Sequence, residues 1–86
     1  MHLNDLKEVF ETAKRRNRNY VGVQIEMKGF PKPEVIINEY ANFDAKLEYY
    51  MKAYNDDLTL KTFNGIRIIG FGYGNTYQEI EELLDV

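Results

Sequence analysis

The segment 70–74 (GFGYG) is the part of the sequence that could most readily hold a ligand. It lies between a predicted strand and a capping box, Thr76 with Glu79, that opens a short helix. Backbone amides at such a junction, with the positive end of a helix dipole, can hold an anion. The spacing is not G-x-G-x-x-G and no Walker lysine follows, so the alternative is that the glycines clear one sheet face for a packed helix or permit a bulge. The candidate residues for binding phosphate or a nucleotide are Gly72, Gly74, Asn75 and Thr76.

The overlapping segment 69–73 (IGFGY) resembles the core of the aromatic strand of RNA-recognition modules, where exposed rings stack on bases. The match is partial, because Ile69 replaces the basic residue of that pattern, and Gly74 and Thr76 replace apolar and aromatic ones. The net charge of −3 also argues against nucleic acid as a partner, since such binding neutralises phosphates.

Other chemistry-bearing residues are sparse. His2 is the only histidine and there is no cysteine, which argues against a transition-metal site, a catalytic triad and disulfides. The basic run 14–18 (KRRNR) is explained as a solvated helix end, where cations meet the negative end of the helix dipole, although it could also contact an acidic partner. Carboxylates form acidic faces, but acid–base catalysis needs a pocket that shifts their pKa, and 86 residues leave little room for one. We therefore expect no enzymatic activity, metal or cofactor.

Aromatic residues are more numerous than so small a core readily absorbs, with seven tyrosines and five phenylalanines. Tyr49 and Tyr50 are neighbours on a predicted helix and cannot both lie at the centre of its apolar stripe. Exposed tyrosine is enriched at protein interfaces, and the alternative is peripheral packing with hydroxyls in water. The candidates for a protein-binding surface are Phe30, Tyr40, Glu48 and Tyr49.

Three helices are expected from the apolar periodicity. The first carries Leu6, Val9, Phe10 and Ala13 at helical spacing, is capped by Asp5 and ends near residue 16. The second follows Asn42 and stops before residue 55, and the third follows Thr76 with Tyr77, Ile80, Leu83 and Leu84 inward.

Four strands are expected at 20–27, 34–38, 58–63 and 66–73. The last two flank Asn64-Gly65, which favours a two-residue type I′ turn with Phe63 opposite Ile66. In that register one face carries Leu58, Leu60, Ile69, Phe71 and Tyr73, and the other carries Phe63, Ile66 and Ile68. The predicted fold is a single α+β domain over residues 1–86, in the order α-β-β-α-β-β-α, with a largely antiparallel four-stranded sheet covered on one face by helices.

Composition is that of an ordinary globular chain, with 44% hydrophobic and 29% charged residues. No run approaches the roughly 20 apolar residues that span a bilayer, and the absence of cysteine and of a signal-like start favours a cytoplasmic protein. Charge is uneven: residues 1–32 carry seven basic and four acidic side chains, whereas residues 33–86 carry four basic and ten acidic ones. This polarity suits a charged partner but does not identify it.

The segments 42–50 (NFDAKLEYY), 54–58 (YNDDL) and 65–71 (GIRIIGF) resemble small uncharacterised proteins encoded by phages and prophages of Gram-positive bacteria. The resemblance implies expression inside a host bacterium, where such proteins often bind and block a host protein. We therefore predict a non-enzymatic protein-interaction module, either a monomer or a homodimer. The alternative is a small anion, nucleotide or RNA binding module that uses the junction at 70–74.

Overall fold

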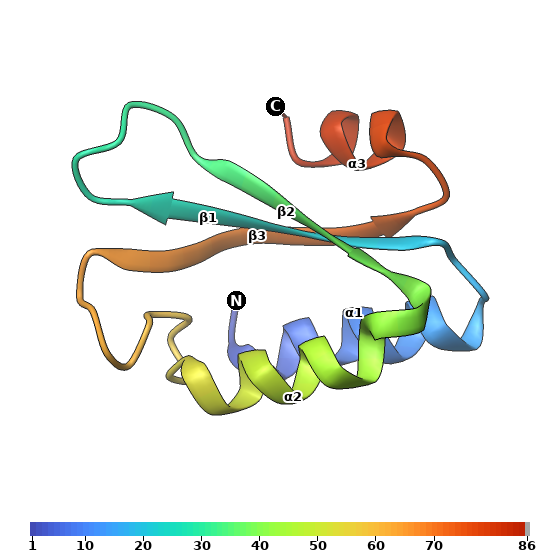
Figure 1. The fold of residues 1–86 in the computed structure, drawn as a ribbon, viewed down its shortest axis with the longest axis horizontal. Helices are drawn as coiled ribbons and strands as arrows, with labels where there is room; N and C mark the ends of the chain where they lie inside the picture. The colour runs from blue at the N-terminus through green and yellow to red at the C-terminus, as the bar shows by residue number, and fades with distance from the viewer. Residues whose placement is uncertain (86) are drawn as a thin grey trace.

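The computed structural model describes residues 1–85, in which a three-stranded antiparallel sheet has helices against both of its faces (Figure 1). The strand order is β2-β1-β3, so β1 is central and both other strands are edges. The α+β class is confirmed, whereas a four-stranded sheet covered on one face is wrong, because α3 lies on the face opposite α1 and α2. In chain order the elements are α1 (Leu3–Arg15), β1 (Tyr20–Met27), β2 (Glu34–Glu39), the short 3-10 helix η1 (Tyr40–Asn42), α2 (Phe43–Ala53), β3 (Ile66–Gly74) and α3 (Tyr77–Leu83).

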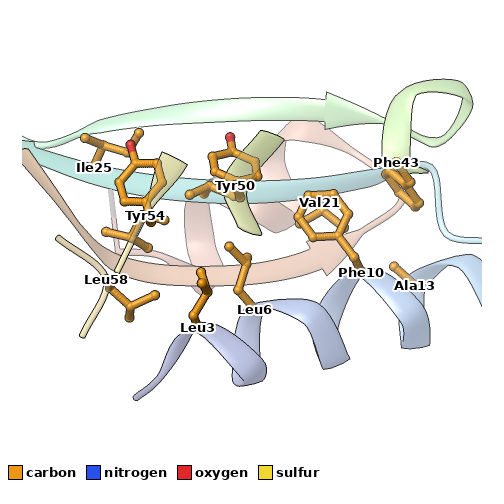
Figure 2. Packing of buried hydrophobic residues seen from close by; sticks show 12 residues of the cluster. Leu3, Leu6, Phe10, Ala13, Val21, Ile25, Phe43, Tyr50, Tyr54 and Leu58 are labelled. Carbon is orange, nitrogen blue, oxygen red and sulfur yellow. The ribbon is translucent and has the colours of Figure 1, made fainter. Parts of the chain in front are cut away.

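The main core lies between the sheet and the pair α1 and α2 (Figure 2). Phe10 of α1 packs edge-on against Phe43 of α2, with ring centroids 5.5 Å apart, and lies 6.0 Å from the ring of Tyr50. Burial of each such ring stabilises the fold by roughly 1.5–3 kcal/mol. The predicted stripe of α1 is confirmed, with Leu6, Phe10 and Ala13 fully buried.

Helix α1 begins earlier than predicted. His2, not Asp5, is its N-cap residue, and Asp5 Oδ2 accepts the His2 backbone N–H at 2.7 Å. The helix ends where expected, because Asn17 adopts a left-handed φ of 53°, which an asparagine tolerates better than most residues.

The predicted strand 58–63 is absent from the described chain. Leu58 has a φ of 72°, outside the extended region, and only the isolated bridges Thr59–Arg67 and Tyr54–Leu60 form around it. Leu60 N–H donates to the Ile66 carbonyl at 2.9 Å, which closes a five-residue loop rather than a two-residue turn. Neither residue 64 nor residue 65 has the positive φ that a type I′ turn requires.

A β-bulge in β3 corrects the predicted distribution of side chains on its faces. Gln24 pairs with Gly70, but the next residue of β1, Ile25, pairs with Ile68, so Ile69 is an extra residue in the strand. Because of this inserted residue, the side chains on its two sides do not follow one continuous alternation between the sheet faces. The residues that consequently share the face turned to α1 and α2 are Ile66, Ile68, Phe71 and Tyr73.

The other sheet face is made flat by glycine and is covered by α3. A Cβ on Gly22 would overlap the side chain of Ile80, which is fully buried there. Tyr77 and Leu83, predicted to point inward, are instead 53% and 58% exposed, because only a narrow stripe of the seven-residue helix meets the sheet.

Candidate protein-binding surface

The polar groups at the junction of β3 and α3, where an anion was predicted to bind, are bonded within the chain. Thr76 Oγ1 accepts the Glu79 N–H at 3.1 Å, and the Glu79 carboxylate lies 3.4 Å from that hydroxyl and 3.5 Å from the Asn75 nitrogen. Asn75 Oδ1 accepts the Asn19 N–H at 3.2 Å, and its carbonyl accepts Asn19 Nδ2 at 3.0 Å. The chain's own carboxylate therefore lies where a bound anion would be held.

Gly72 and Gly74 lie beneath α3. A Cβ on Gly72 would overlap the Leu83 side chain, and a Cβ on Gly74 would come within 3.1 Å of Glu79 Cβ. Close approach of a helix to the strand explains why these positions are glycine. The four predicted residues are neighbours in space, but the geometry gives them a packing and capping role.

The rings that resemble an RNA-stacking strand are turned toward the core. Phe71 and Tyr73 pack against the cluster between the sheet and α1 and α2, and Tyr73 Oη accepts a hydrogen bond from Arg16 Nη1 at 2.9 Å. Stacking on bases requires rings that stand free on a sheet face, so the feature on which the resemblance depends is missing.

The basic run at the end of α1 is largely engaged in contacts within the chain. Lys14 Nζ donates to both carboxylate oxygens of Asp44 at 2.9 Å, and this bond together with the charge of Asp44 raises the pKa of Lys14. Arg15 Nη2 reaches Thr12 Oγ1 at 3.4 Å. These contacts fit the interpretation of the run as a helix end that also links α1 to α2.

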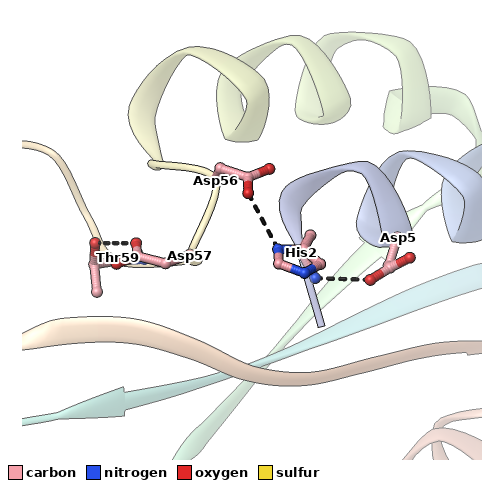
Figure 3. Close-up of polar contacts among 5 residues, drawn as sticks. All are labelled: His2, Asp5, Asp56, Asp57 and Thr59. Atoms are coloured by element: carbon pink, nitrogen blue, oxygen red, sulfur yellow. Dashed lines mark hydrogen bonds and ion pairs between the residues drawn. The ribbon is translucent and has the colours of Figure 1, made fainter.

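His2, Asp56 and Asp57 form exposed contacts that fix the loop after α2 (Figure 3). His2 Nδ1 lies 3.1 Å from Asp56 Oδ2, with both side chains mostly exposed. Asp57 Oδ1 accepts the backbone N–H of Thr59 at 3.1 Å and its hydroxyl at 2.5 Å, and these bonds lower the pKa of Asp57. The contacts hold the loop that inserts Leu58, at 2% exposure, into the core.

The surface of the described chain has shallow hollows of about 250 to 470 Å³, and the hollow of about 430 Å³ lies between the loops at 28–33 and 64–65. Within residues 1–85, no group of three or more His, Asp or Glu residues is placed to hold a metal ion. No helix in the same range has the length and apolar character needed to cross a membrane.

The predicted protein-binding residues do not form one patch. Phe30, 61% exposed, lies in the loop before β2, whereas Tyr40, 43% exposed, follows the end of that strand. Six residues of β2, about 20 Å of extended chain, separate them (Figure 1). Tyr40 also makes two contacts within the chain. Its hydroxyl donates to Asn17 Oδ1 at 3.4 Å, and the centroid of its ring lies 5.3 Å from that of Phe43.

Glu48 and Tyr49 lie on α2, and Tyr49 is the better placed of the two for a partner. Glu48 Oε1 accepts Lys52 Nζ at 2.7 Å, a bond that lowers the pKa of Glu48. Asp44 marks the side of α2 that faces α1, and Tyr49 lies about 140° around the helix from it. Since α1 contacts β1 and β3 while α2 contacts β2, Tyr49 lies on the side of α2 that is turned away from α1, the same side as the outer edge of β2.

The outer edge of β2 carries unpaired backbone groups. Tyr40 N–H donates to the Asn19 carbonyl at 2.9 Å, and strict alternation along an antiparallel pair then directs the backbone N–H of Val35, Ile37 and Glu39 away from β1. Across residues 1–85, β2 has no strand partner except β1.

One buried side chain of β2 bonds to β1, and three apolar side chains of β2 are partly exposed beside its outer edge. Asn38, 1% exposed, donates through Nδ2 to the Val21 carbonyl at 3.0 Å, which ties β2 to β1. Ile36 points toward the α2 side and is 39% exposed, while Val35 and Ile37 are half-buried on the α3 side. We name the outer backbone edge of β2, these three side chains and Tyr49 the β2 edge surface.

Sequence reasoning found Tyr49 but missed the rest of this surface. The order of the strands in the sheet decides which strand lies at an edge. The periodicity of a single strand carries no information about that order. The only available signal is an absence: the stretch 34–39 (EVIINE) lacks the Lys and Pro that commonly protect an edge strand, and its charged residues, Glu34 and Glu39, lie only at its two ends.

Comparison of the chain with protein-family models, with curated proteins and with solved structures gave no match. The function is therefore argued from the geometry of the chain itself.

Proposed function

We propose that the protein is a non-enzymatic protein-binding module that pairs an extended segment of its partner with the outer edge of β2. In this mode of recognition, main-chain hydrogen bonds supply affinity and the alternating side chains supply specificity. The observation that carries the proposal is the row of unpaired N–H groups on Val35, Ile37 and Glu39 beside exposed apolar side chains.

The contrast between the two edges of the sheet supports this choice. The outer edge of β3 is partly covered, because Ile68 N–H donates to the Leu58 carbonyl and Leu60 N–H donates to the Ile66 carbonyl, both at 2.9 Å. The bulge at Ile69 also interrupts that strand. Neither device protects β2, which pairs with β1 in continuous register.

The flanks of the β2 edge surface are suited to side chains of a bound strand. Ile36 and Tyr49 lie on the α2 side, and Val35 and Ile37 lie on the α3 side. A strand laid along the edge would therefore contact apolar groups with alternate side chains. Tyr49 supplies contact area with little rotamer entropy, as tyrosine does at many interfaces.

The finer prediction, that the protein is a phage-derived regulator or an anti-defence inhibitor of a host protein, is the version of this proposal in which the bound strand belongs to a host protein. The alternative of anion or RNA binding at the β3–α3 junction gains no observation in its favour, since Glu79 and α3 occupy that junction.

Site-specific photocrosslinking tests the proposal. Tyr49→p-benzoylphenylalanine is compared with the same change at Tyr77, which is equally exposed at 53% but lies on α3. Irradiation in a bacterial lysate should give a discrete protein adduct at position 49 and none at position 77. Adducts that are missing at 49, or the same at both positions, would refute the β2 edge surface as the binding site.

A further inference from the structure

We infer that the segment paired with β2 is the β2 strand of a second copy of this chain, so that two sheets join into one of six strands. The inference rests on the proposed function and names the partner. The two copies would be related by a two-fold axis perpendicular to the sheet, which makes the added pair antiparallel.

The backbone restricts the possible registers. Residues 35, 37 and 39 direct their groups outward by the alternation along β2, so each must face another outward residue; the same alternation continued one residue before the strand would turn the Pro33 carbonyl outward as well. A register that set Glu34 against Glu39 of the second copy would pair an inward residue with an outward one, and it would also place like charges opposite each other. Of the registers that obey this rule, those centred on Ile36 and on Ile37 align the most residues of β2.

Hydrogen bonding at the ends of β2 favours the register centred on Ile36. There Glu39 lies opposite Pro33 of the second copy. Pro33 has a carbonyl but no N–H, and Glu39, the N-cap residue of η1, has its carbonyl engaged by that helix and its N–H free. The N–H of Glu39 can thus donate to the Pro33 carbonyl, and neither residue has a further backbone group in need of a partner. Centring on Ile37 instead requires the Glu39 carbonyl to accept a bond from Val35.

Side-chain pairing favours the same register. Ile36 meets Ile36 of the second copy on the α2 side, and Val35 meets Ile37 on the α3 side. Directly opposed β-branched residues stabilise antiparallel pairs, and no acidic residue lies opposite another acidic one. In the alternative register Val35 would face Glu39 and Ile36 would face Asn38.

Cysteine crosslinking tests both the dimer and its register, because the native chain has no cysteine. At the axis, the two Ile36 positions form a non-hydrogen-bonded pair with Cα atoms about 4.5 Å apart, within the range of a disulfide. The two Ile37 positions are then diagonal neighbours, about 7–8 Å apart. We expect Ile36→Cys to oxidise to a covalent dimer at least tenfold faster than Ile37→Cys, with both variants folded by circular dichroism.

Light scattering of the unmodified chain completes the test. The molar mass should rise from 10.2 kDa toward twice that value between about 10 μM and 1 mM, the range of weak interfaces. Equal or faster crosslinking at position 37 would overturn the register, and a mass constant at 10.2 kDa would overturn the dimer. A monomer that still gives a foreign adduct at position 49 refutes this inference alone, whereas a monomer without any adduct refutes the proposed function as well.

Discussion

Strands β2 and β3 occupy equivalent places at the two edges of the sheet, yet they differ in where their notable residues point. The glycines and aromatic rings of β3, which suggest chemistry in the sequence, face α3 and the core. Strand β2 has no motif, but it leaves backbone donors and apolar side chains open to a partner. A conspicuous sequence pattern can therefore result from packing alone, whereas a strand without any motif can form a binding surface because it lies at the edge of the sheet.

The largest effect on stability is expected at Leu58, in the segment that covers the outer edge of β3. Leu58→Ala should lower the free energy of unfolding by about 2–4 kcal/mol, because it deletes a side chain that is 2% exposed. Leu58→Gly removes the same packing but relaxes the φ of 72°, so it should be less destabilising than Ala by about 0.5–1 kcal/mol. Urea denaturation measures both values. A glycine variant less stable than the alanine one would contradict the account of the strained position.

Alkaline pH should also weaken the region that covers β3. Burial raises the pKa of Tyr54 to about 12, above its value of about 10 when unfolded. The folded state therefore holds its proton more tightly, so stability is intact below pH 10 and is lost as the pH rises toward 12. This loss should reach about 2–3 kcal/mol.

Tyr54→Phe is the control for this pH effect. Burial also raises the pKa of Tyr50, so the variant should keep a part of the alkaline loss that belongs to Tyr50. Unfolding measured from pH 8 to 12 should show a smaller pH dependence than in the unmodified chain. An unchanged dependence would exclude Tyr54 as its source.

Two glycine substitutions separate packing from ligand binding on the α3 face. Gly22→Ala should cost about 1–3 kcal/mol, because Ile80, fully buried, cannot move aside. Gly72→Ala should cost less than about 1 kcal/mol, because Leu83 is 58% exposed and can rotate away. Thermal melts compare the two variants. A phosphate-induced rise in melting temperature that Gly72→Ala abolishes would restore the anion-binding alternative.

The smallest effect on stability is expected at β2, where the effect on assembly is largest. Ile36→Lys should change the free energy of unfolding by no more than about 1 kcal/mol, since the side chain is already 39% exposed. It should abolish the rise of molar mass with concentration, because two lysines would meet at the axis. Tyr77→Lys, on α3, should leave that rise unchanged.

The elements with a clear period were predictable, and the features set by long-range pairing were not. The inward stripe of α1 and the strand at 20–27 are confirmed, since each depends on local spacing. The two-residue turn at Asn64-Gly65 does not form: a five-residue loop closed by Leu60 and Ile66 replaces it, next to the buried Leu58 with its positive φ. The glycines at 70, 72 and 74 indicated that a bulge was possible, but not that Ile69 would be the inserted residue, so the predicted faces of β3 were mixed.

The candidate site was predictable only in part for the same reason. Tyr49 could be identified as exposed from its neighbour Tyr50 on one helix. Phe30 and Tyr40 could not be excluded from the same patch without knowing that β2 runs between them. The outer edge of β2 exists only because β1 pairs with β3 on its other side, and that pairing joins residues about 50 positions apart.

Amide exchange along β2 is a decisive test of pairing at its outer edge, because neighbouring residues provide an internal control. The Ile36 N–H bonds to β1 and should be protected at every concentration, whereas the Ile37 N–H points outward and can be protected only by a second strand. We predict that protection of Ile37 rises steeply as the protein is concentrated from about 10 μM to 1 mM. Unprotected exchange of Ile37 at the highest concentration, beside a protected Ile36, would contradict the account.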